Sequence, residues 1–517
     1  MKQYNKIHES TYFDSVTLML ISSKLGDLDG VQEAAVMMGT DHNKRLMIQS
    51  GVLDPETAER VRPNDMVVGI LAESDEVIHT ALARLEELMH EKNQSADEKV
   101  EIVHSIDTVK NVLPGANFCI VSLPGKYAGR ETMRAMQQGM HVLLFSDNVD
   151  LETEIRLKDY ALEHGLLMMG PDCGTAIVNG VALGFANRVR RGNIGLVAAA
   201  GTGLQEVTTL IHRMGGGVSQ ALGTGGRDGK SAVGGRMLLQ CLDALAQDEG
   251  TEFIGIISKP LAEDVLVRLE AAITQVSKPV VACFLGAPVP DSKTDLLRAC
   301  TLEDAAAMLC SLALKAPVAD LLQQLEQVQA PDAVHFAPEQ KYLRGLYSGG
   351  TLCYETMLLL QQKNIDTFSN IAVDPALQLA DVEKSVAHTL IDMGDDYFTN
   401  GMPHPMIDSR LRAERIVREA SDPETAVILL DCVLGYGSNP DPAGELVKAI
   451  RRANTARDAA GCVTYVASIC GTDEDIQHRQ AQKRLLEEAN VIVLESNAQA
   501  ARYAADLVLQ ATGGNEI

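Results

Sequence analysis

The residues best suited to chemistry occur in one short pattern that appears twice. Gly201-Thr202 is followed by Glu206, and Gly350-Thr351 is followed by Glu355. Each copy comes after a short apolar run and opens a segment with helical spacing. A glycine turn at a helix start leaves backbone N–H groups free, and the helix dipole adds positive charge there, so each copy predicts an anion site. Two copies predict a duplicated domain, with a site between its halves.

Further glycine-rich loops follow other predicted strands. Ligands of open α/β sheets bind beyond the carboxyl ends of the strands, which is where such loops lie. A single loop of this kind more often just ends a strand, but several along one sheet edge favour a binding site. We therefore expect phosphate or substrate contacts from this set of loop residues: Gly201, Thr202, Gly203, Gly225, Gly226, Arg227, Gly349, Gly350, Thr351, Gly435, Gly437 and Ser438.

A few side chains in the loops could act on a substrate. Arg227 follows two glycines and could grip a carboxylate or phosphate with two N–H groups, or form only a surface salt bridge. His404 lies between two prolines and, with Asp396, is a candidate for proton transfer, although an exposed loop histidine is the simpler interpretation. Cys173 has no histidine near it in sequence, so a packing role is favoured over attack on a substrate.

Composition excludes several classes of function. The net charge of −25 disfavours nucleic acid as a partner, because a polyanion would be repelled. The ten cysteines are scattered without a Cys-x-x-Cys pair, so neither a disulfide framework nor a metal site is expected. No apolar run approaches the length of a membrane span, and the first residues contain no apolar signal segment. A cytoplasmic protein with no membrane partner is the expectation.

The elements that position these loops alternate regularly. Near-continuous apolar strands such as "GLVAAAG" and "AVILLDCVLG" are followed by amphipathic helices, which predicts parallel sheets covered on both faces. Polar or proline-marked stretches divide the chain into four predicted domains: 1–95, 96–188, 189–325 and 338–517. The last two share the order of strands, glycine turns and the Gly-Thr start, so we interpret them as a repeat.

Several motifs together resemble a known family. "LLMMGPDCGT", "RRGNIGLVAAAGTGLQE" and "ALGTGGRD" resemble the α subunit of succinyl-CoA synthetase and related NDP-forming acyl-CoA synthetases, and "FSDNV" and "GDDYFTNGMPHPMID" resemble the FdrA family of fused synthetase-like proteins. The resemblance implies an α/β fold: a small N-terminal α/β domain, a Rossmann-like CoA-binding-type domain and two flavodoxin-like ligase domains. It also implies that two helix starts face one phosphate, the first at Thr202 and the second after Ser438 rather than after Gly350.

Departures from the family pattern shape the expected function. The family carries phosphate on a histidine, but this chain has none between His212 and His335. The nucleotide-binding region of the partner subunit is absent, and the glycine fingerprint for CoA is missing. Asp172 and Cys173 match the family's cofactor-binding Gly-Pro-Asn-Cys loop, with aspartate replacing asparagine, so CoA remains possible. No other cofactor is expected.

FdrA-family proteins are associated with oxamate carbamoyltransferase, which works in complexes with other polypeptides. The resemblance thus implies a subunit that uses inorganic phosphate or carbamoyl phosphate as substrate without a phosphohistidine, in a hetero-complex or possibly as a homodimer. Two alternatives stay open: a subunit of an NDP-forming acyl-CoA ligase, and a non-catalytic subunit that binds a small anionic metabolite.

Overall fold

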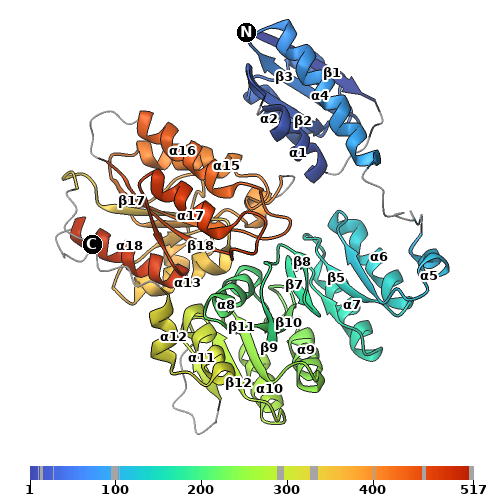
Figure 1. Ribbon diagram of the computed structural model, residues 1–517, viewed down its shortest axis with the longest axis vertical. Helices are drawn as coiled ribbons and strands as arrows, with labels where there is room; N and C mark the ends of the chain where they lie inside the picture. The colour runs from blue at the N-terminus through green and yellow to red at the C-terminus, as the bar shows by residue number, and fades with distance from the viewer. Residues whose placement is uncertain are drawn as a thin grey trace. The chain divides into compact units, whose positions relative to one another are not determined.

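The computed structural model describes residues 1–9, 11, 15–26, 28–94, 103, 105–287, 296–325, 336–399, 402–456 and 462–511. The linker expected near residue 95 and residues 326–335 of the linker expected over 316–340 lie outside the described residues, while Val318–Gln324 within the second form a helix. The chain divides into two compact units, Met1–Ile102 with Thr399–Pro403, and Val103–Phe398 with His404–Ile517. The first unit is drawn in blue in Figure 1, apart from the short later segment.

The first unit is a three-stranded antiparallel sheet with helices on both faces. The strand order is β1-β3-β2, which places β3 in the centre. Its sequence MVVGILA is apolar throughout because α1 and α4 cover one face and α2 and α3 the other. The elements are β1 (Lys2–His8), α1 (Ser15–Gly26), β2 (Val31–Met38), α2 (Asp41–Gln49), α3 (Pro55–Arg60), β3 (Met66–Ala72) and α4 (Asp75–Gln94).

The second unit begins with a small parallel sheet of order β4-β5-β6. Helices α6 and α7 pack on it through one apolar cluster. Asp150 caps α7, since its carboxylate accepts the N–H of Thr153. The elements are η1 (Ile106–Thr108), α5 (Val109–Val112), β4 (Phe118–Val121), α6 (Gly125–Gln137), β5 (His141–Leu144), α7 (Leu151–Glu163) and β6 (Met168–Met169).

A seven-stranded sheet follows, with the order β13-β12-β11-β9-β10-β7-β8. Its five parallel strands have the flavodoxin order, and the antiparallel hairpin β7–β8 extends the edge. The elements are β7 (Thr175–Val178), β8 (Val181–Gly184), β9 (Arg191–Ala198), α8 (Gly201–Arg213), β10 (Val218–Gly223), α9 (Arg236–Gln247), β11 (Phe253–Ser258), α10 (Glu263–Ile273), β12 (Val280–Phe284), β13 (Leu297–Ala299), α11 (Leu302–Leu314) and α12 (Val318–Gln324).

The last sheet has the order β15-β16-β14-β17-β18-β19 and is parallel throughout. All nine residues of β17 are buried, as its apolar run predicted. The elements are β14 (Tyr342–Tyr347), α13 (Gly350–Gln361), β15 (Phe368–Ser369), η2 (Pro375–Leu377), β16 (Thr389–Asp392), α14 (Asp396–Thr399), α15 (Arg410–Ser421), β17 (Thr425–Val433), α16 (Pro442–Ala456), β18 (Thr464–Cys470), α17 (Arg479–Glu488), β19 (Val491–Leu494) and α18 (Asn497–Ala511).

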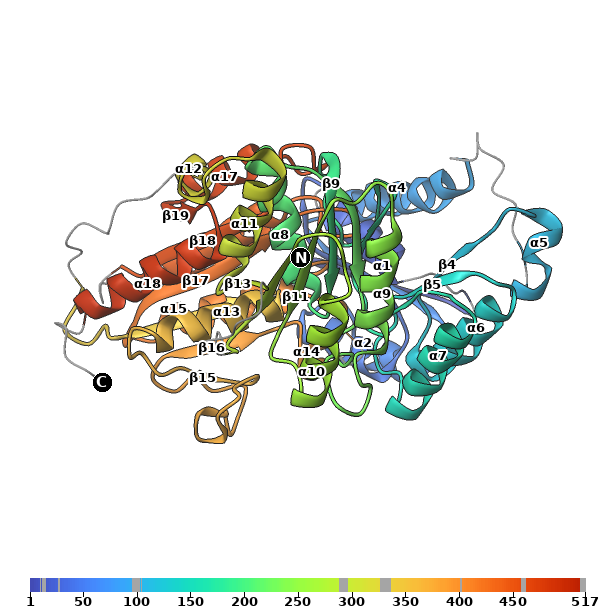
Figure 2. The ribbon, with the colours of Figure 1, turned by 90° about the horizontal axis from the view of Figure 1, so that it is seen from below.

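The predicted α/β fold with parallel sheets and the predicted repeat are confirmed. In the seven-stranded sheet β9 lies between β10 and β11, and in the last sheet β14 lies between β16 and β17, so β9-α8 corresponds to β14-α13. The two halves share one apolar core, to which α8, α11, α13 and α18 all contribute. Figure 2 shows α13 and α18 running along one face of the last sheet, near β17.

Candidate functional site

The two Gly-Thr motifs lie against each other. The N–H of Thr351 donates a hydrogen bond to Oγ1 of Thr202 at 3.3 Å, and both threonines are buried. A Cβ atom on Gly203 would stand 2.9 Å from Cγ2 of Thr351, and one on Gly349 would stand 3.0 Å from Cβ of Thr202. Glycine at these positions therefore lets the first turns of α8 and α13 meet, and the motif joins the two flavodoxin-like halves.

The two glutamates of the motif strengthen this interface, because each accepts hydrogen bonds from the other half. Glu206 of α8 accepts the N–H of Asn497, at the start of α18, at 3.0 Å. Glu355 of α13 accepts the N–H of Leu302, at the start of α11, and the side-chain amide of Asn497, both at 2.8 Å. Each half thus caps a helix of the other: Glu206 caps α18 and Glu355 caps α11. Burial raises the pKa of Glu355 to about 7.

The start of α13 already holds anions supplied by the chain. The carboxylate of Asp431 accepts the N–H groups of Ser348 and Gly349, at 2.9 and 2.8 Å, and pairs with Arg412 at 2.7 Å. The carboxylate of Asp392 lies so close to Gly350 that a Cβ there would be 2.1 Å from Oδ2. These carboxylates satisfy the positive end of α13, which leaves little room for an added anion.

The start of α8 is open by contrast. Ala200 occupies the cap position without a side-chain hydrogen bond, and the first N–H to turn back into the helix is that of Leu204. In the described part of the chain, no acceptor is recorded for the N–H groups of Gly201, Thr202 and Gly203. Gly201 is exposed, and its nearest neighbour for a Cβ is 3.9 Å away. Three aligned donors at a helix start suit phosphate or carboxylate.

A lysine stands in the neighbouring loop. Ile257 pairs with Ala198 at the end of β9, so Lys259, two residues further on, follows the strand next to the α8 start. Its ammonium group lies 5.7 Å from the ring centre of Tyr354. Within the described ranges no carboxylate forms an ion pair with it, although its charge acts on Asp392 and counters the burial that raises the pKa of Asp392 to about 6.

The loop of Lys259 follows a predicted strand, but neither Lys259 nor Asp392 was given a role from the sequence. Both stand at the end of an apolar run, in "GIISKP" and "TLIDMG", and that position was the signal that could have found them. The loop containing Lys259 ends the third parallel strand of its sheet, next to the first strand. This is the position at which open α/β sheets bind their ligands.

The expected pairing of α8 with the helix after Ser438 is wrong. That helix, α16, begins only at Pro442, and Asp441 caps it by accepting the N–H of Gly444 at 3.2 Å. The helix that meets α8 is α13, whose start at Gly350 corresponds to Gly201 in the repeat. The Gly-Thr motif thus predicted the helix that contacts α8 better than the matching of strand order did.

Gly435, Gly437 and Ser438 form a turn instead of a helix start. Both glycines have positive φ, of 119° and 75°, and a Cβ on Gly435 would lie 2.8 Å from the carbonyl oxygens of Phe185 and Ala186. The hydroxyl of Ser438 is buried, and no hydrogen-bond partner is recorded for it among the described residues. The turn therefore packs against the strand hairpin, and its glycines are needed for shape.

Asp172 lies at the end of β6, in the left-handed region with φ of 54°. By surface area Asp172 is solvent-exposed, but protein atoms lie close to its carboxyl group. The resulting loss of hydration raises the pKa of that carboxyl to about 7. Asp147, Asp396 and Asp392 add to the shift, and Arg227 opposes it. These residues lie in loops that follow strands of all three sheets of the second unit. Their charges therefore act on one region.

The loop after β10 brings Arg227 to this region. A Cβ on Gly225 would lie 2.3 Å from the carbonyl oxygen of Pro171, so glycine lets this loop touch the loop after β6. Gly226 is exposed and has open space around it. The guanidinium of Arg227 is 44% exposed, and its Nε lies 2.8 Å from a carboxylate oxygen of Glu154. Arg227 is thus already in an ion pair, but one that keeps it at the site.

His404 is held as a neutral ring. Its Nδ1 accepts the N–H of Met406 at 3.2 Å, so the proton must be on Nε2. Burial lowers the pKa of His404 to about 4, and its ring lies 5.6 Å from that of Phe185. The arrangement favours Nε2–H as a hydrogen-bond donor. Asp396, at the start of α14, is exposed, and its pKa is raised by burial and by Asp395.

Cys173 is placed for packing. Its side chain is 3% exposed, its sulfur lies 3.5 Å from the carbonyl oxygen of Thr175, and a Cβ on Gly223 would come within 2.6 Å of it. Burial raises the pKa of the thiol to about 12, so it stays protonated at neutral pH. The geometry fits the packing interpretation.

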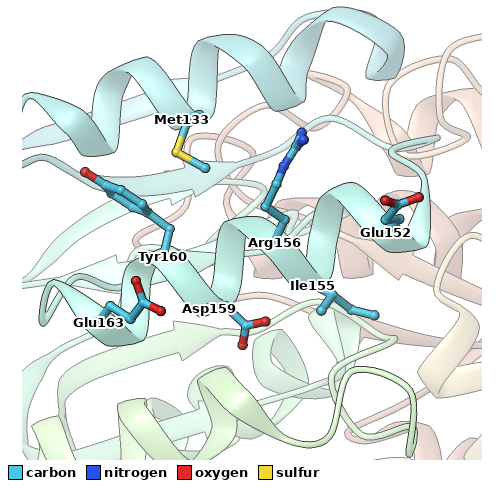
Figure 3. Close-up of a pocket in the computed structure, with 7 residues that line it drawn as sticks. All are labelled: Met133, Glu152, Ile155, Arg156, Asp159, Tyr160 and Glu163. Atoms are coloured by element: carbon cyan, nitrogen blue, oxygen red, sulfur yellow. The ribbon is translucent and has the colours of Figure 1, made fainter.

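A shallow groove of about 380 Å³ lies elsewhere, between α6 and α7. Figure 3 shows Met133 reaching from α6 toward the side chains of α7. Its lining includes Arg156 and Tyr160 with three acidic residues, but none of the residues singled out from the sequence. The groove therefore does not belong to the candidate site.

The residues present bear on whether this chain could hold a metal ion or CoA. Over the described ranges, no group of three or more His, Cys, Asp or Glu side chains could hold a metal ion. The CoA-type sheet has three strands, half of a doubly wound sheet. A Cβ on Gly125, in its first strand-to-helix turn, would lie 2.4 Å from the carbonyl oxygens of Asp147 and Asn148. Glycine at this position therefore lets the turn touch the loop after β5.

Comparison with known proteins gives the family. The chain is 42% identical over 506 residues to the uncharacterized protein YahF of Escherichia coli, covering 97% of this chain and 98% of YahF. The chain belongs to the YahF family. Residues 346–507 match the CoA-ligase family, and residues 1–103 match a domain described as "AllF, heavy metal-associated domain". Since the first cysteine of the chain is Cys119, that matched region offers no thiolate to a heavy metal.

More distant relatives are succinyl-CoA ligase subunits. The α subunit of ADP-forming succinate–CoA ligase from Methanothermobacter thermautotrophicus is 25% identical over 197 residues, 38% of this chain and 65% of that subunit. A solved structure of acetyl-CoA synthetase 1 from Ca. Korarchaeum cryptofilum, in complex with phosphate and ADP, matches with 14% identity and a TM-score of 0.35, covering 81% of this chain and 87% of that one. The CoA-ligase match and the succinate–CoA ligase relatives show that this chain is succinyl-CoA ligase-like.

The length and apolar character of the helices bear on whether the chain could cross a membrane. Along the described ranges, no single helix combines the length and apolar character needed to cross a bilayer, and one sharply bent pair, α11 with α12, passes by length and composition only.

Proposed function

We propose that the chain is a subunit of a transferase that forms or consumes carbamoyl or acyl phosphate, of the oxamate carbamoyltransferase type associated with the FdrA family. The observation that carries the proposal is the open start of α8 beside Lys259, in a ligase-like pair of domains without a histidine where that fold carries its phosphate. Three free N–H groups and a cation would bind inorganic phosphate directly.

The chemistry needs no covalent enzyme intermediate. A phosphate oxygen held by Gly201, Thr202 and Gly203 would attack the carbamoyl carbon, the bond from that carbon to the leaving nitrogen would break, and the proton of hydrogen phosphate would end on that nitrogen. Nε2–H of His404 would donate to the oxyanion of the tetrahedral intermediate. Positioning and charge stabilisation would then supply most of the rate enhancement.

A ligase subunit that works with a partner's nucleotide domain is the second candidate. The match to the CoA-ligase family and the ADP-forming relatives favour it. The missing phosphate-carrying histidine speaks against it. Acid-labile labelling of this chain by radioactive ATP, in a mixture with its partner subunits, would support the ligase instead.

The proposal is tested by the thermal stability of the full chain with phosphate, carbamoyl phosphate, oxamate, CoA or ATP added. We expect protection by phosphate and carbamoyl phosphate. Lys259→Met should weaken that protection about tenfold or more, equal to a loss of about 1.4 kcal/mol. Lys278→Met is the matched control, because Lys278 precedes β12, at the amino ends of the parallel strands, whereas Lys259 follows the carboxyl end of β11.

Two outcomes would overturn the proposal. Protection by CoA or ATP alone would favour the ligase. Protection by phosphate without turnover, once the chain is combined with its partner subunits, would leave a metabolite-binding subunit.

A further inference from the structure

A buried chain of alternating charges joins α7 to the loop after β10. The ammonium of Lys158 lies 2.8 Å from Glu154 and 2.9 Å from Asp228, and all three side chains are buried. Lys158 also donates to the carbonyl oxygen of Thr224 at 3.0 Å. Asp228 in turn accepts the N–H of Leu238, at the start of α9, at 2.7 Å. The loop that carries Arg227 is therefore anchored from two sides.

Arg227 is the exposed end of this chain of charges. Its Nε lies 2.8 Å from the second oxygen of Glu154, and its Nη2 donates to the carbonyl oxygen of Val149 at 2.6 Å. Nη1 has no recorded partner among the described residues. Arg227 is thus held by one hydrogen bond and one ion pair, while its side chain stays 44% exposed.

The charges leave Arg227 as the exposed end of a neutral series. Asp228, Lys158, Glu154 and Arg227 alternate in sign and sum to zero, so the series is neutral until an anion joins it at Arg227. Buried charges that are paired in this way are held rigidly, because breaking one pair leaves a charge without a partner in a low-dielectric interior. A fixed guanidinium loses less side-chain entropy when it binds, which strengthens binding.

Acidic side chains near Arg227 limit what the anion can be. Asp147 and Asp396 act on the same region as Asp172, so a large polyanion would be repelled. Protein atoms around the Asp172 carboxyl and the nearby Asp147 raise its pKa, and this reduces the repulsion of a single carboxylate. A small monocarboxylate that also carries N–H groups for the aspartates suits these surroundings.

We propose that Glu154, backed by Lys158, is a positioning residue that fixes Arg227 to receive the carboxylate of a small amide substrate. The inference rests on the proposed function, because it assigns the carboxylate end of the molecule whose carbamoyl group phosphate would attack. Glu154 itself is buried beneath Arg227 and touches no substrate.

The test compares two probes on the full chain, oxamate and inorganic phosphate, with oxamide as the analogue that lacks a carboxylate. Glu154→Gln keeps the size of the side chain and removes its charge. We expect its apparent Kd for oxamate to rise about tenfold while its Kd for phosphate stays within about twofold. Oxamide should bind the wild type and Glu154→Gln equally weakly.

The control is Asp159→Asn, which breaks the pair between Asp159 on α7 and Arg236 on α9 without touching Arg227. It should change neither Kd. If Glu154→Gln does not fold, Glu154→Asp and Arg227→Lys replace it, and each should weaken oxamate selectively.

Each failure has its own signature. Equal oxamate affinity of wild type and Glu154→Gln, with phosphate still bound, would overturn the positioning role alone. A wild type that binds no phosphate would instead overturn the proposed function.

Discussion

Replacing Gly201 by proline removes one phosphate donor and little else. Gly201 is the first residue of α8, a position at which proline is favoured because its missing N–H has no partner within the helix. Ala200 is extended, with φ of −156° and ψ of 102°, which is the region that a residue before proline adopts. A Cβ at Gly201 meets nothing closer than 3.9 Å. The fold should therefore tolerate Gly201→Pro.

The size of the effect follows from the number of donors. Three N–H groups are available, and a hydrogen bond to a charged group contributes about 1.5–3 kcal/mol. Losing one of them should raise the Kd for phosphate about 10- to 150-fold. The free energy of unfolding without ligand should stay equal or rise by about 0.4–1 kcal/mol, because proline restricts the unfolded chain.

Isothermal titration of phosphate into the full chain measures this directly. Gly201→Ala is the matched control, since it adds a Cβ in open space and keeps the N–H. If Gly201→Pro and Gly201→Ala bind phosphate equally well, the anion does not sit on the start of α8, and the reasoning from free N–H groups is refuted.

Three further predictions concern the interface and the buried groups. Asn497→Ala should lower the free energy of unfolding in urea by about 2 kcal/mol, because it leaves Glu355 short of a buried partner, and no change would show that the crossed caps contribute nothing. The folded-state pKa of Glu355, about 7, lies above its unfolded value, so stability should fall as pH rises from about 4.5 through 7, and Glu355→Gln should flatten that slope by up to about 1.4 kcal/mol per pH unit. Cys173→Ala should bind phosphate with unchanged Kd, whereas a loss would mean that the thiol takes part in binding.

The sheets could be predicted because their signal is local. The run AVILL within β17 is buried on both sides, and apolar strands alternating with amphipathic helices favour parallel sheets covered on both faces. The hairpin β7–β8 was not foreseen as part of the third sheet, since its four-residue strands resemble a loop and their pairing with β10 is a tertiary contact.

The site was harder to predict because its partners are distant in sequence. Glu206 and Glu355 look like caps of their own helices, and only the fold shows that they meet Asn497 and Leu302 across the domain interface. The same holds for Arg227, whose buried partner Glu154 belongs to another sheet. The sequence predicted the N–H and guanidinium donors of the site. Only the fold shows which of them have a recorded partner among the described residues.

The two copies of the motif have diverged in the charge around them. Two helix starts packed against each other place two partial positive charges together, which is unfavourable unless anions lie nearby. In the second copy, β16 ends with Asp392 and β17 contains Asp431, and these carboxylates neutralise α13. The matching strands of the first copy, VSQALG and FIGIIS, contain no carboxylate. The start of α8 therefore needs an anion from solution, which is why a duplicated motif should bind one phosphate instead of two.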